Sequence, residues 1–279
     1  MAKPLKIIGK WISWNRSFLY DQNEQRKIHG KLGFNSADLH ERVLKESEPI
    51  FVLSTGRCGT ALLTKILKND DSLNVHHEPS PALIYHSKKA YEQKNDNRWL
   101  TSTFDAARYE LMRDSYLLNK RYVETNNRVT FFANGIVDLF PKAKFIHLDR
   151  EVYEFVISGL SRNWYSYEKM VDEGRIVSKT DDWNNLSQSE KITWLWKETN
   201  QEIRSFSKNH PNKVYYISSN ELFKNESKIQ DLLVFLGIDG INTATINKSI
   251  SVKVNKQSSK TKVKLSDSQR FEINKMINS

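Results

Sequence analysis

Residues 50–67 read IFVLSTGRCGTALLTKIL and combine three patterns that together decide the fold. Residues 50–53 are all apolar, which is typical of a short strand buried on both faces of a sheet. The loop STGRCGT follows, and its two glycines, Gly56 and Gly59, allow the backbone to turn tightly. From Thr60 onward, apolar residues recur at helical spacing. The stretch therefore predicts a strand, a tight loop and a helix that begins at the loop.

This loop is a predicted anion-binding site. The first N–H groups of a helix have no intrahelical partner, so they are available to a negatively charged group in the loop. Arg57 stands between the two glycines and adds a fixed positive charge that suits phosphate oxygens. We therefore expect the loop to hold the phosphate end of a nucleotide, although an arginine in a loop can also be a plain surface residue.

Predicted strands alternate with predicted helices along the chain. That alternation is typical of one parallel sheet covered by helices on both faces. No clear linker interrupts it, so we predict a basic N-terminal arm over residues 1–35 and a single α/β domain over residues 36–279, with a central sheet of about five strands. The predicted strands are residues 50–53, 72–77, 121–124, 144–148 and 214–217.

The charge balance points to an anionic partner without saying which one. The 279 residues include 43 Lys and Arg against 33 Asp and Glu, which gives a formal net charge of +10. A hydrophobic content of 38% argues against wholesale disorder. The positive excess fits an anionic cofactor, a polyanion or an acidic membrane surface. The arm of residues 1–35 interleaves aromatic and basic residues, which allows peripheral membrane contact or packing on the domain.

Cysteine usage and hydropathy predict a soluble, cytoplasmic protein. Cys58 is the only cysteine, so no intramolecular disulfide can form. No apolar run reaches the ~18–20 residues that span a bilayer, and charged residues interrupt any secretory leader at the N-terminus. No metal is expected, because His76 and His77 lie in neither an HExxH pattern nor a cysteine cluster.

The loop does not match the P-loop of nucleoside triphosphatases. That motif requires G-x4-G-K-[ST], with a lysine that reaches the β- and γ-phosphates. Here no lysine stands between Gly59 and Thr60, and Ser54 occupies the position of the first glycine. Asp149 is at best a weak candidate for a magnesium ligand. Hydrolysis of ATP or GTP is therefore disfavoured, although the loop and the helix N-terminus are still suited to binding an anion.

Two segments resemble sulfotransferases that use 3′-phosphoadenosine 5′-phosphosulfate (PAPS). STGRCGT after an apolar strand is similar to the family's loop for the 5′-phosphosulfate. FIHLDREVYEFVISGL is similar to its segment for the 3′-phosphate, where an arginine ends a strand and a serine lies eight residues on. The Glu78-Pro79 pair after the second strand resembles a third family feature. The resemblance covers about residues 49–237 and implies the P-loop NTPase-like sulfotransferase fold.

The resemblance implies two separated anion sites for the two ends of PAPS. The first loop is implied to hold the 5′-phosphosulfate, and Arg150 with Ser158 the 3′-phosphate. An ATP-dependent enzyme has no use for the second site. Without the resemblance, Arg150 is equally explained by pairing with a nearby acid, and Ser158 by packing in a helix. The predicted cofactor-binding residues are Arg57, Cys58, Gly59, Thr60, Ala61, Arg150 and Ser158.

The implied reaction places a base at the end of the second strand. An acceptor hydroxyl must lose its proton as it attacks, and Glu78 follows a strand whose carboxyl end faces the ligand edge of the sheet. Glu78 is the predicted base and His77 the alternative, while Arg57 is predicted to stabilise the transferring group. The acceptor that we expect is a small molecule or a glycan with a hydroxyl group, namely a carbohydrate or a related metabolite. Glu124, Asn126 and Arg128 resemble residues that line the acceptor site, although strand-end capping explains them equally.

Cys58 invites a second interpretation, because a neighbouring arginine and a helix N-terminus predict a lowered thiol pKa. Nucleophilic catalysis as in cysteine phosphatases requires Cys, five residues and then Arg. Residue 64 is Thr, so that chemistry is disfavoured.

Two other functions stay open at this point. One is a nucleotide kinase-like enzyme with a degenerate P-loop. The other is a nonenzymatic polyanion-binding protein that uses the basic arm and a lysine-rich segment after residue 247. That segment lacks interleaved aromatic residues for base stacking, so no specific nucleic acid is expected. The oligomeric state is left open.

Overall fold

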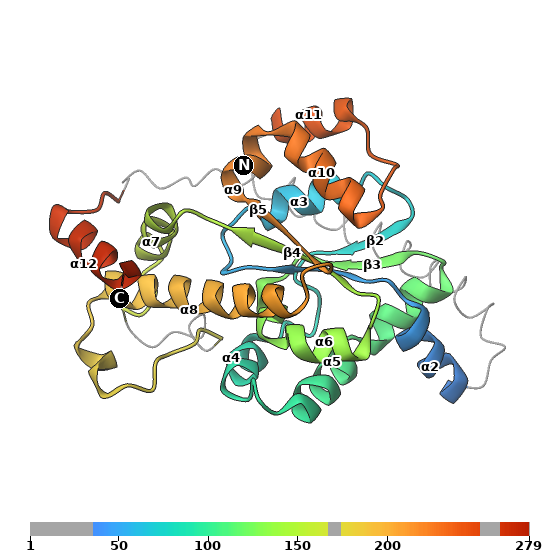
Figure 1. The fold of residues 1–279 in the computed structure, drawn as a ribbon, viewed down its shortest axis with the longest axis horizontal. Coiled ribbons are helices and arrows are strands. Elements are labelled where there is room, and N and C mark those ends of the chain that lie inside the picture. Colours follow the sequence, from blue (N-terminus) through green and yellow to red (C-terminus); the bar gives the residue numbers. More distant parts are fainter. Residues whose placement is uncertain (1–35, 167–173, 252–262, 279) are drawn as a thin grey trace, which may run out of the picture.

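A five-stranded parallel sheet forms the centre of the molecule, as the sequence predicts (Figure 1). The computed structural model describes residues 36–166, 174–251 and 263–278. Its strands follow the order β2-β3-β1-β4-β5, and each neighbouring pair is parallel. The strands are β1 (Ile50–Leu53), β2 (Leu73–His76), β3 (Arg121–Glu124), β4 (Lys144–Asp149) and β5 (Val214–Ser218).

Strand β1 lies in the middle of this sheet and is buried on both faces. Ile50 pairs with Val123 of β3 on one side and with Lys144 of β4 on the other. Successive side chains of β1 point to opposite faces. Ile50 and Val52 therefore join the apolar core above the sheet, while Phe51 and Leu53 join the core below it. The continuous apolar run of residues 50–53 is thus explained by burial on two sides.

Helices cover both faces of the sheet (Figure 1). One face carries α3 (Thr60–Leu67), α9 (Ser219–Lys224), α10 (Glu226–Leu236) and α11 (Thr243–Ser251). The other face carries α2 (Ser36–Glu46), α4 (Ile84–Glu92), α5 (Asn97–Leu117), the 3₁₀ helix η1 (Asn127–Phe132) and α6 (Ala133–Leu139). A third group packs around a separate apolar cluster: α7 (Val152–Leu160), α8 (Gln188–Asn209) and α12 (Asp267–Asn278). The 3₁₀ helix η3 (Asp181–Asn185) precedes α8.

Several elements differ from the sequence prediction. α4, α9 and α11 had no predicted counterpart, because each is short and buries few side chains; α4 buries only Ser87 and Ala90. The single helix predicted over residues 131–140 is instead η1 followed by α6, since Asn126 caps a 3₁₀ turn by accepting from the backbone of Arg128. The predicted arm of residues 1–35 lies outside the described residues, as does most of the lysine-rich segment.

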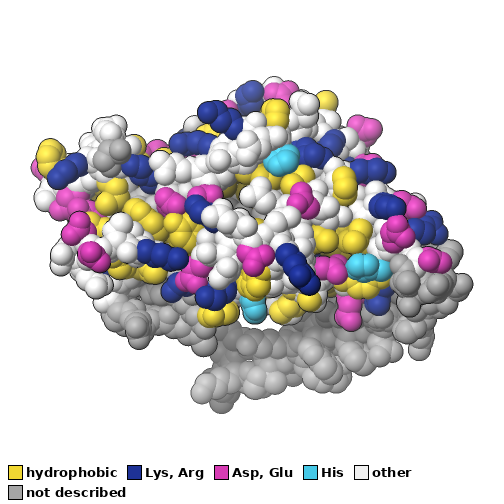
Figure 2. All heavy atoms as spheres, turned by 60° about the horizontal axis from the view of Figure 1, so that its bottom comes forward, with side chains coloured by type: hydrophobic (Ala, Val, Ile, Leu, Met, Phe, Trp, Pro, Cys, Tyr) yellow, Lys and Arg dark blue, Asp and Glu magenta, His cyan; other side chains and the backbone are white. Residues whose placement is uncertain are grey.

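The surface charge is mixed on the face that Figure 2 shows. Basic and acidic side chains are interspersed there over the described elements. The net charge of +10 is therefore not gathered into a single basic patch on that face.

An ion pair without exposed atoms links α5 to β3. The Arg108 guanidinium donates two hydrogen bonds of 2.8 and 2.9 Å to the Glu124 carboxylate, and both side chains are fully buried. Tyr122 and Asn126 each donate one further hydrogen bond to that carboxylate. Arg108 also donates to the carbonyl of Pro81, in the segment that follows β2. The network therefore holds the β2–α4 connection against the sheet.

We expect Arg108→Leu to lower the free energy of unfolding by about 3–5 kcal/mol, because it leaves the Glu124 carboxylate buried without its counter-ion. Urea denaturation followed by circular dichroism measures the change. The matched control is Arg113→Leu on the same helix, whose pair with Asp114 is partly exposed and should contribute about 0–1 kcal/mol. Equal losses in the two variants would contradict the role given to the buried pair.

Candidate functional site

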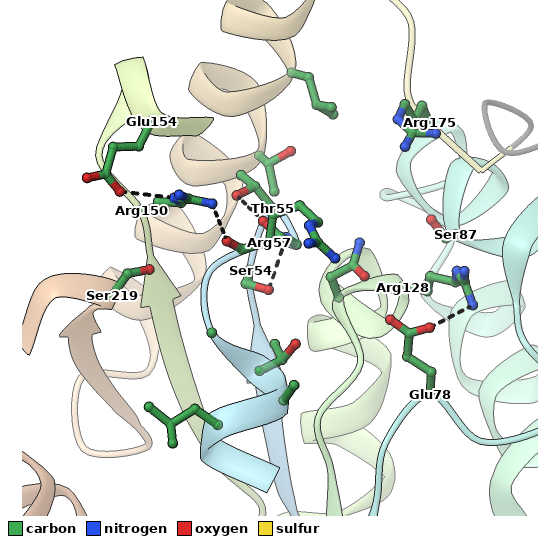
Figure 3. A pocket seen from close by; sticks show the side chains of 18 of the residues that line it. Ser54, Thr55, Arg57, Glu78, Ser87, Arg128, Arg150, Glu154, Arg175 and Ser219 are labelled. Carbon is green, nitrogen blue, oxygen red and sulfur yellow. Dashed lines mark hydrogen bonds and ion pairs between the residues drawn. The ribbon is translucent and has the colours of Figure 1, made fainter. Parts of the chain in front are cut away.

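A cavity of about 910 Å³ opens at the edge of the sheet where the parallel strands end (Figure 3). Segments that are far apart in sequence line it: the loop after β1, the residues after β2, α4, η1, the start of α7, the segment between α7 and η3, α8 and α9. The predicted residues Arg57, His77, Glu78 and Arg150 all lie on this lining. The structure thus brings together residues that the sequence separates by up to 93 positions.

The loop after β1 has the tight geometry that its glycines predict. Gly56, Arg57 and Gly59 all have positive φ angles, of 82°, 61° and 106°. A Cβ atom at Gly59 would lie 3.0 Å from the ring of Phe223 and 3.1 Å from Leu222. Glycine at position 59 is therefore required by both the backbone conformation and the close approach of α9.

Hydrogen bonds to neighbouring elements fix the loop. The backbone N–H of Ser54 donates to the hydroxyl of Thr130, which in turn donates to the carbonyl of Ser54. The hydroxyl of Ser219 lies 2.6 Å from the carbonyl oxygen of Cys58 and 2.9 Å from that of Asp149, so it links the loop to the end of β4. The loop is consequently held from both sides before any ligand binds.

The N-terminus of α3 supplies backbone donors to the cavity. The N–H groups of Leu62 and Leu63 donate to the carbonyl of Gly59, which begins the helix. Thr60 and Ala61 precede those donors and line the cavity. Their N–H groups have no intrahelical acceptor in helix geometry, so they are available to an anion.

The predicted lowering of the Cys58 thiol pKa was wrong. The side chain is completely buried, does not line the cavity, and donates its S–H to the carbonyl of Gly56. Burial raises the pKa of the thiol to about 12, whereas proximity to Arg57 and a helix N-terminus had predicted a lower pKa. Only the backbone of residue 58 can therefore contact a ligand in the cavity.

Arg150 connects the end of β4 to the first loop. Its guanidinium donates to the carbonyl of Arg57 at 2.8 Å and to the carboxylate of Glu154 at 3.2 Å (Figure 3). Its own carbonyl accepts a hydrogen bond from the indole of Trp196. Arg150 thus pairs with an acid of the following helix, and it also lines the cavity beside the loop after β1.

Ser158 lies on α7 and is 8% exposed. It is not among the cavity-lining residues, and its hydroxyl accepts a hydrogen bond from Arg162 at 2.9 Å. Burial and the positive charges of Arg57, Arg150 and Arg175 lower the pKa of Arg162. Arg162 therefore lies in a field of positive charge behind the cavity wall, and an anion bound near Arg57 and Arg150 would offset part of that charge.

His77 and Glu78 directly follow strand β2 at the other side of the cavity. The His77 Nδ1 atom lies 2.9 Å from the backbone carbonyl of Thr125. Because a carbonyl only accepts, this contact requires a proton on Nδ1 and leaves Nε2 as the acceptor. Glu78 lines the cavity and lies 3.9 Å from a guanidinium nitrogen of Arg128 (Figure 3). Both candidates for the base are therefore well placed.

The residues implied for the acceptor site divide into two groups. Arg128 lines the cavity. Glu124 and Asn126 are completely buried outside it and belong to the Arg108 network, so their predicted place in the acceptor site was wrong. The sequence pattern fitted a strand-end network equally well, and this is what the structure shows.

Residues of α9 and of the segment between α7 and η3 were missed. Ser218, Ser219, Asn220, Phe223 and Lys224 line the cavity, as do Trp164, Gly174 and Arg175. A signal for α9 was present, because Ser218 and Glu221 form a capping box of the S-x-x-E type. No comparable local pattern marks Trp164 or Arg175.

Two further observations concern the described residues only. Within residues 36–166, 174–251 and 263–278, no group of three or more His, Cys, Asp and Glu side chains is arranged to hold a metal ion. Across the same residues, no helix is both long and apolar enough to traverse a bilayer.

Comparison with protein families identifies the class of protein. Residues 49–241 match the model of a sulfotransferase family. The match covers well over half of the chain, and the chain therefore belongs to the sulfotransferase family. A comparison with curated protein sequences found no significant match.

A solved structure supports the fold, and others show a weaker similarity. A sulfotransferase from Alicyclobacillus acidocaldarius matches with a TM-score of 0.51 and 14% identity, covering 83% of this chain and 91% of that one. The sulfotransferase domain from the curacin biosynthetic pathway matches with a TM-score of 0.47 and 14% identity, covering 83% and 96%. A sulfotransferase from Mycobacterium avium matches with a TM-score of 0.49 and 12% identity, covering 90% of this chain and 81% of that one.

The burial of Cys58 predicts an unreactive thiol. With a pKa of about 12, the thiolate fraction at pH 8 is roughly 10⁻⁴, and the side chain is also closed to reagents. We expect reaction with 5,5′-dithiobis(2-nitrobenzoate) at pH 8 to be more than roughly 1000-fold slower in the folded protein than in guanidinium chloride. Rapid stoichiometric labelling of the folded protein would contradict this placement.

Proposed function

We propose that the protein is a PAPS-dependent sulfotransferase that moves a sulfuryl group to the hydroxyl of a small molecule or a glycan. Membership of the sulfotransferase family supports the reaction class. The choice of donor rests on one observation: the guanidinium of Arg150 binds the carbonyl of Arg57, so the two predicted anion sites border one cavity. A donor with phosphate groups at its 5′ and 3′ positions suits two adjacent cationic sites.

The loop would bind the 5′ end of this donor. Arg57 and the N–H groups of Gly59, Thr60 and Ala61 would contact the phosphosulfate, with the Thr60 hydroxyl as a further donor. Arg150 would contact the 3′-phosphate, and Ser158, whose hydroxyl now accepts a hydrogen bond from Arg162, would have to turn toward it. A bound 3′-phosphate would compete with Glu154 for the guanidinium of Arg150.

The two alternative functions receive less support. The family match favours a sulfotransferase over a nucleotide kinase, and the loop lacks the lysine that a triphosphate site requires. A polyanion-binding protein requires a large basic surface, whereas the face in Figure 2 mixes both charges. The single cysteine supports the cytoplasmic location that we infer.

The proposed reaction is an in-line displacement at sulfur. The acceptor oxygen forms a bond to sulfur as the bond between sulfur and the 5′-phosphate oxygen breaks. The products are a sulfate ester and adenosine 3′,5′-bisphosphate. The acceptor proton passes to Glu78 or to Nε2 of His77. Arg57 and the helix N–H groups stabilise the charge that develops on the leaving phosphate.

Arg150→Ala tests the 3′-phosphate site. We expect the wild-type protein to bind adenosine 3′,5′-bisphosphate at least about tenfold more tightly than AMP, because a charged hydrogen bond contributes about 1.5–3 kcal/mol. The variant should bind both nucleotides with similar affinity. Isothermal titration calorimetry measures both affinities.

Arg113→Ala is the control, because Arg113 lies on α5 outside the cavity lining and pairs with its neighbour Asp114. It should keep the wild-type preference for the bisphosphate. Equal binding of the bisphosphate and AMP by the wild-type protein would overturn the proposed donor.

Glu78→Gln and His77→Gln identify the base. Removing the base should lower the turnover rate by roughly 10²–10⁴-fold and leave the affinity for adenosine 3′,5′-bisphosphate unchanged, since general base catalysis contributes about that much. We expect the large loss in Glu78→Gln. Labelled PAPS supplied with a panel of hydroxyl acceptors measures turnover.

A large loss of turnover in His77→Gln alone would show that His77 is the base. Normal turnover in both variants would show that neither residue is the base.

A further inference from the structure

One polar side chain of the cavity lining has no role in the reaction described so far. Asn127 lines the cavity as the first residue of η1. Across the described residues, its carboxamide makes no hydrogen bond. Its neighbour Asn126, by contrast, caps η1 and donates to the Glu124 carboxylate. The two adjacent asparagines therefore differ, because one supports the fold and the other presents a free amide at the cavity.

The carboxamide of Asn127 lies directly against the loop after β1. A Cβ atom at Gly56 would lie 3.2 Å from both Cγ and Nδ2 of Asn127, and 3.4 Å from its Oδ1. The whole amide group is thus packed on this one glycine. The close approach adds a second reason for glycine at residue 56, beside its φ of 82°.

Asn127 also lies between this loop and the candidate bases. The next residue, Arg128, has a guanidinium nitrogen 3.9 Å from the Glu78 carboxylate. Figure 3 shows Arg57 of the loop on one side of this region, and Glu78 with Arg128 on the other. In-line transfer moves the sulfuryl group from the donor on the loop toward an acceptor beside the base. The path of that group therefore passes Asn127.

The backbone that carries Asn127 is fixed before any ligand binds. The hydroxyl of Thr130 accepts from the N–H of Ser54 and donates to its carbonyl, both at 3.0 Å, which ties η1 to the end of β1. On the other side of Asn127, the side chain of Asn126 is completely buried. The amide of Asn127 is held by no such bond, so it can turn about its Cβ–Cγ bond and present Nδ2. A free donor on a rigid support needs little reorganisation to bind a ligand oxygen.

The oxygens of the sulfuryl group need a donor of their own. Arg57 and the N–H groups at the start of α3 are needed at the 5′-phosphate, where charge develops as the bond to sulfur breaks. The sulfuryl group must meanwhile stay in line between the leaving oxygen and the acceptor oxygen. A carboxamide offers two N–H donors and carries no charge. It can therefore orient the sulfuryl oxygens without drawing the phosphate away from the cationic groups.

We propose that Asn127 is a catalytic residue that donates a hydrogen bond from Nδ2 to an oxygen of the transferring sulfuryl group. Asn127 forms no covalent bond and transfers no proton. The acceptor oxygen bonds to sulfur, the bond from sulfur to the 5′-phosphate oxygen breaks, and the acceptor proton goes to the base. The inference rests on the proposed function, because it requires PAPS as the donor.

Asn127→Leu and Asn127→Ala test the inference, since leucine keeps the size of the side chain without its donors and alanine removes the side chain. Isothermal titration without acceptor compares PAPS, which carries the sulfuryl group, with adenosine 3′,5′-bisphosphate, which lacks it. We expect each variant to bind PAPS about tenfold more weakly than the wild-type protein does, because a hydrogen bond to a charged group is lost. Affinity for the bisphosphate should stay at the wild-type value.

Turnover of labelled PAPS with a panel of hydroxyl acceptors gives a second readout. Removal of one well-placed donor lowers kcat by about 10²–10³-fold, and we expect a loss of this size in both variants. Asn209→Leu is the matched control, because Asn209 is the exposed last residue of α8 and lies outside the cavity lining. It should keep the wild-type affinities and turnover.

Wild-type PAPS affinity and turnover in both Asn127 variants would overturn the inference and leave the proposed function standing. Equal weakening of PAPS and the bisphosphate would also overturn it, because Asn127 would then support the loop and not contact the sulfuryl group. If the wild-type protein bound neither nucleotide, the proposed donor itself would be wrong, and the inference would fall with it.

Discussion

The pairing of β1 with a parallel strand on each side is the constraint on which the cavity depends. Parallel strands place their carboxyl ends at one edge of a sheet, so the segments after β1, β2 and β4 meet there. The loop after β1 turns through Gly56 and Gly59 and delivers the N-terminus of α3 to the centre of that edge. Arg150 arrives from β4, and Glu78 arrives from β2 across β3. The geometry of the site thus follows from strand order.

The sequence predicted the parts of the site whose signal is local. A buried strand, two glycines and an apolar helix predicted the loop, and an arginine at a strand end predicted Arg150. The side chain of Cys58 and the role of Glu124 could not be predicted, because burial and long-range pairing are decided by packing. Trp164 and Arg175 were missed for the same reason: they reach the cavity through a segment without periodicity.

Electrostatics shape the cavity around the first loop. The arginines around the first loop repel one another, and the pKa of Arg162 falls as a result of burial and of this repulsion. A positively charged cavity in the free protein is matched by the proposed donor with its two anionic ends. In such a site, binding energy and charge stabilisation during transfer come from the same fixed groups.

The central claim is that one cavity holds both anionic ends of a single nucleotide. A crystal structure with adenosine 3′,5′-bisphosphate tests it most directly. We expect the 5′-phosphate to lie on the N–H groups of Thr60 and Ala61, and the 3′-phosphate to lie within hydrogen-bonding distance of Arg150. A 3′-phosphate that points into solvent, or a nucleotide bound outside this cavity, would contradict it.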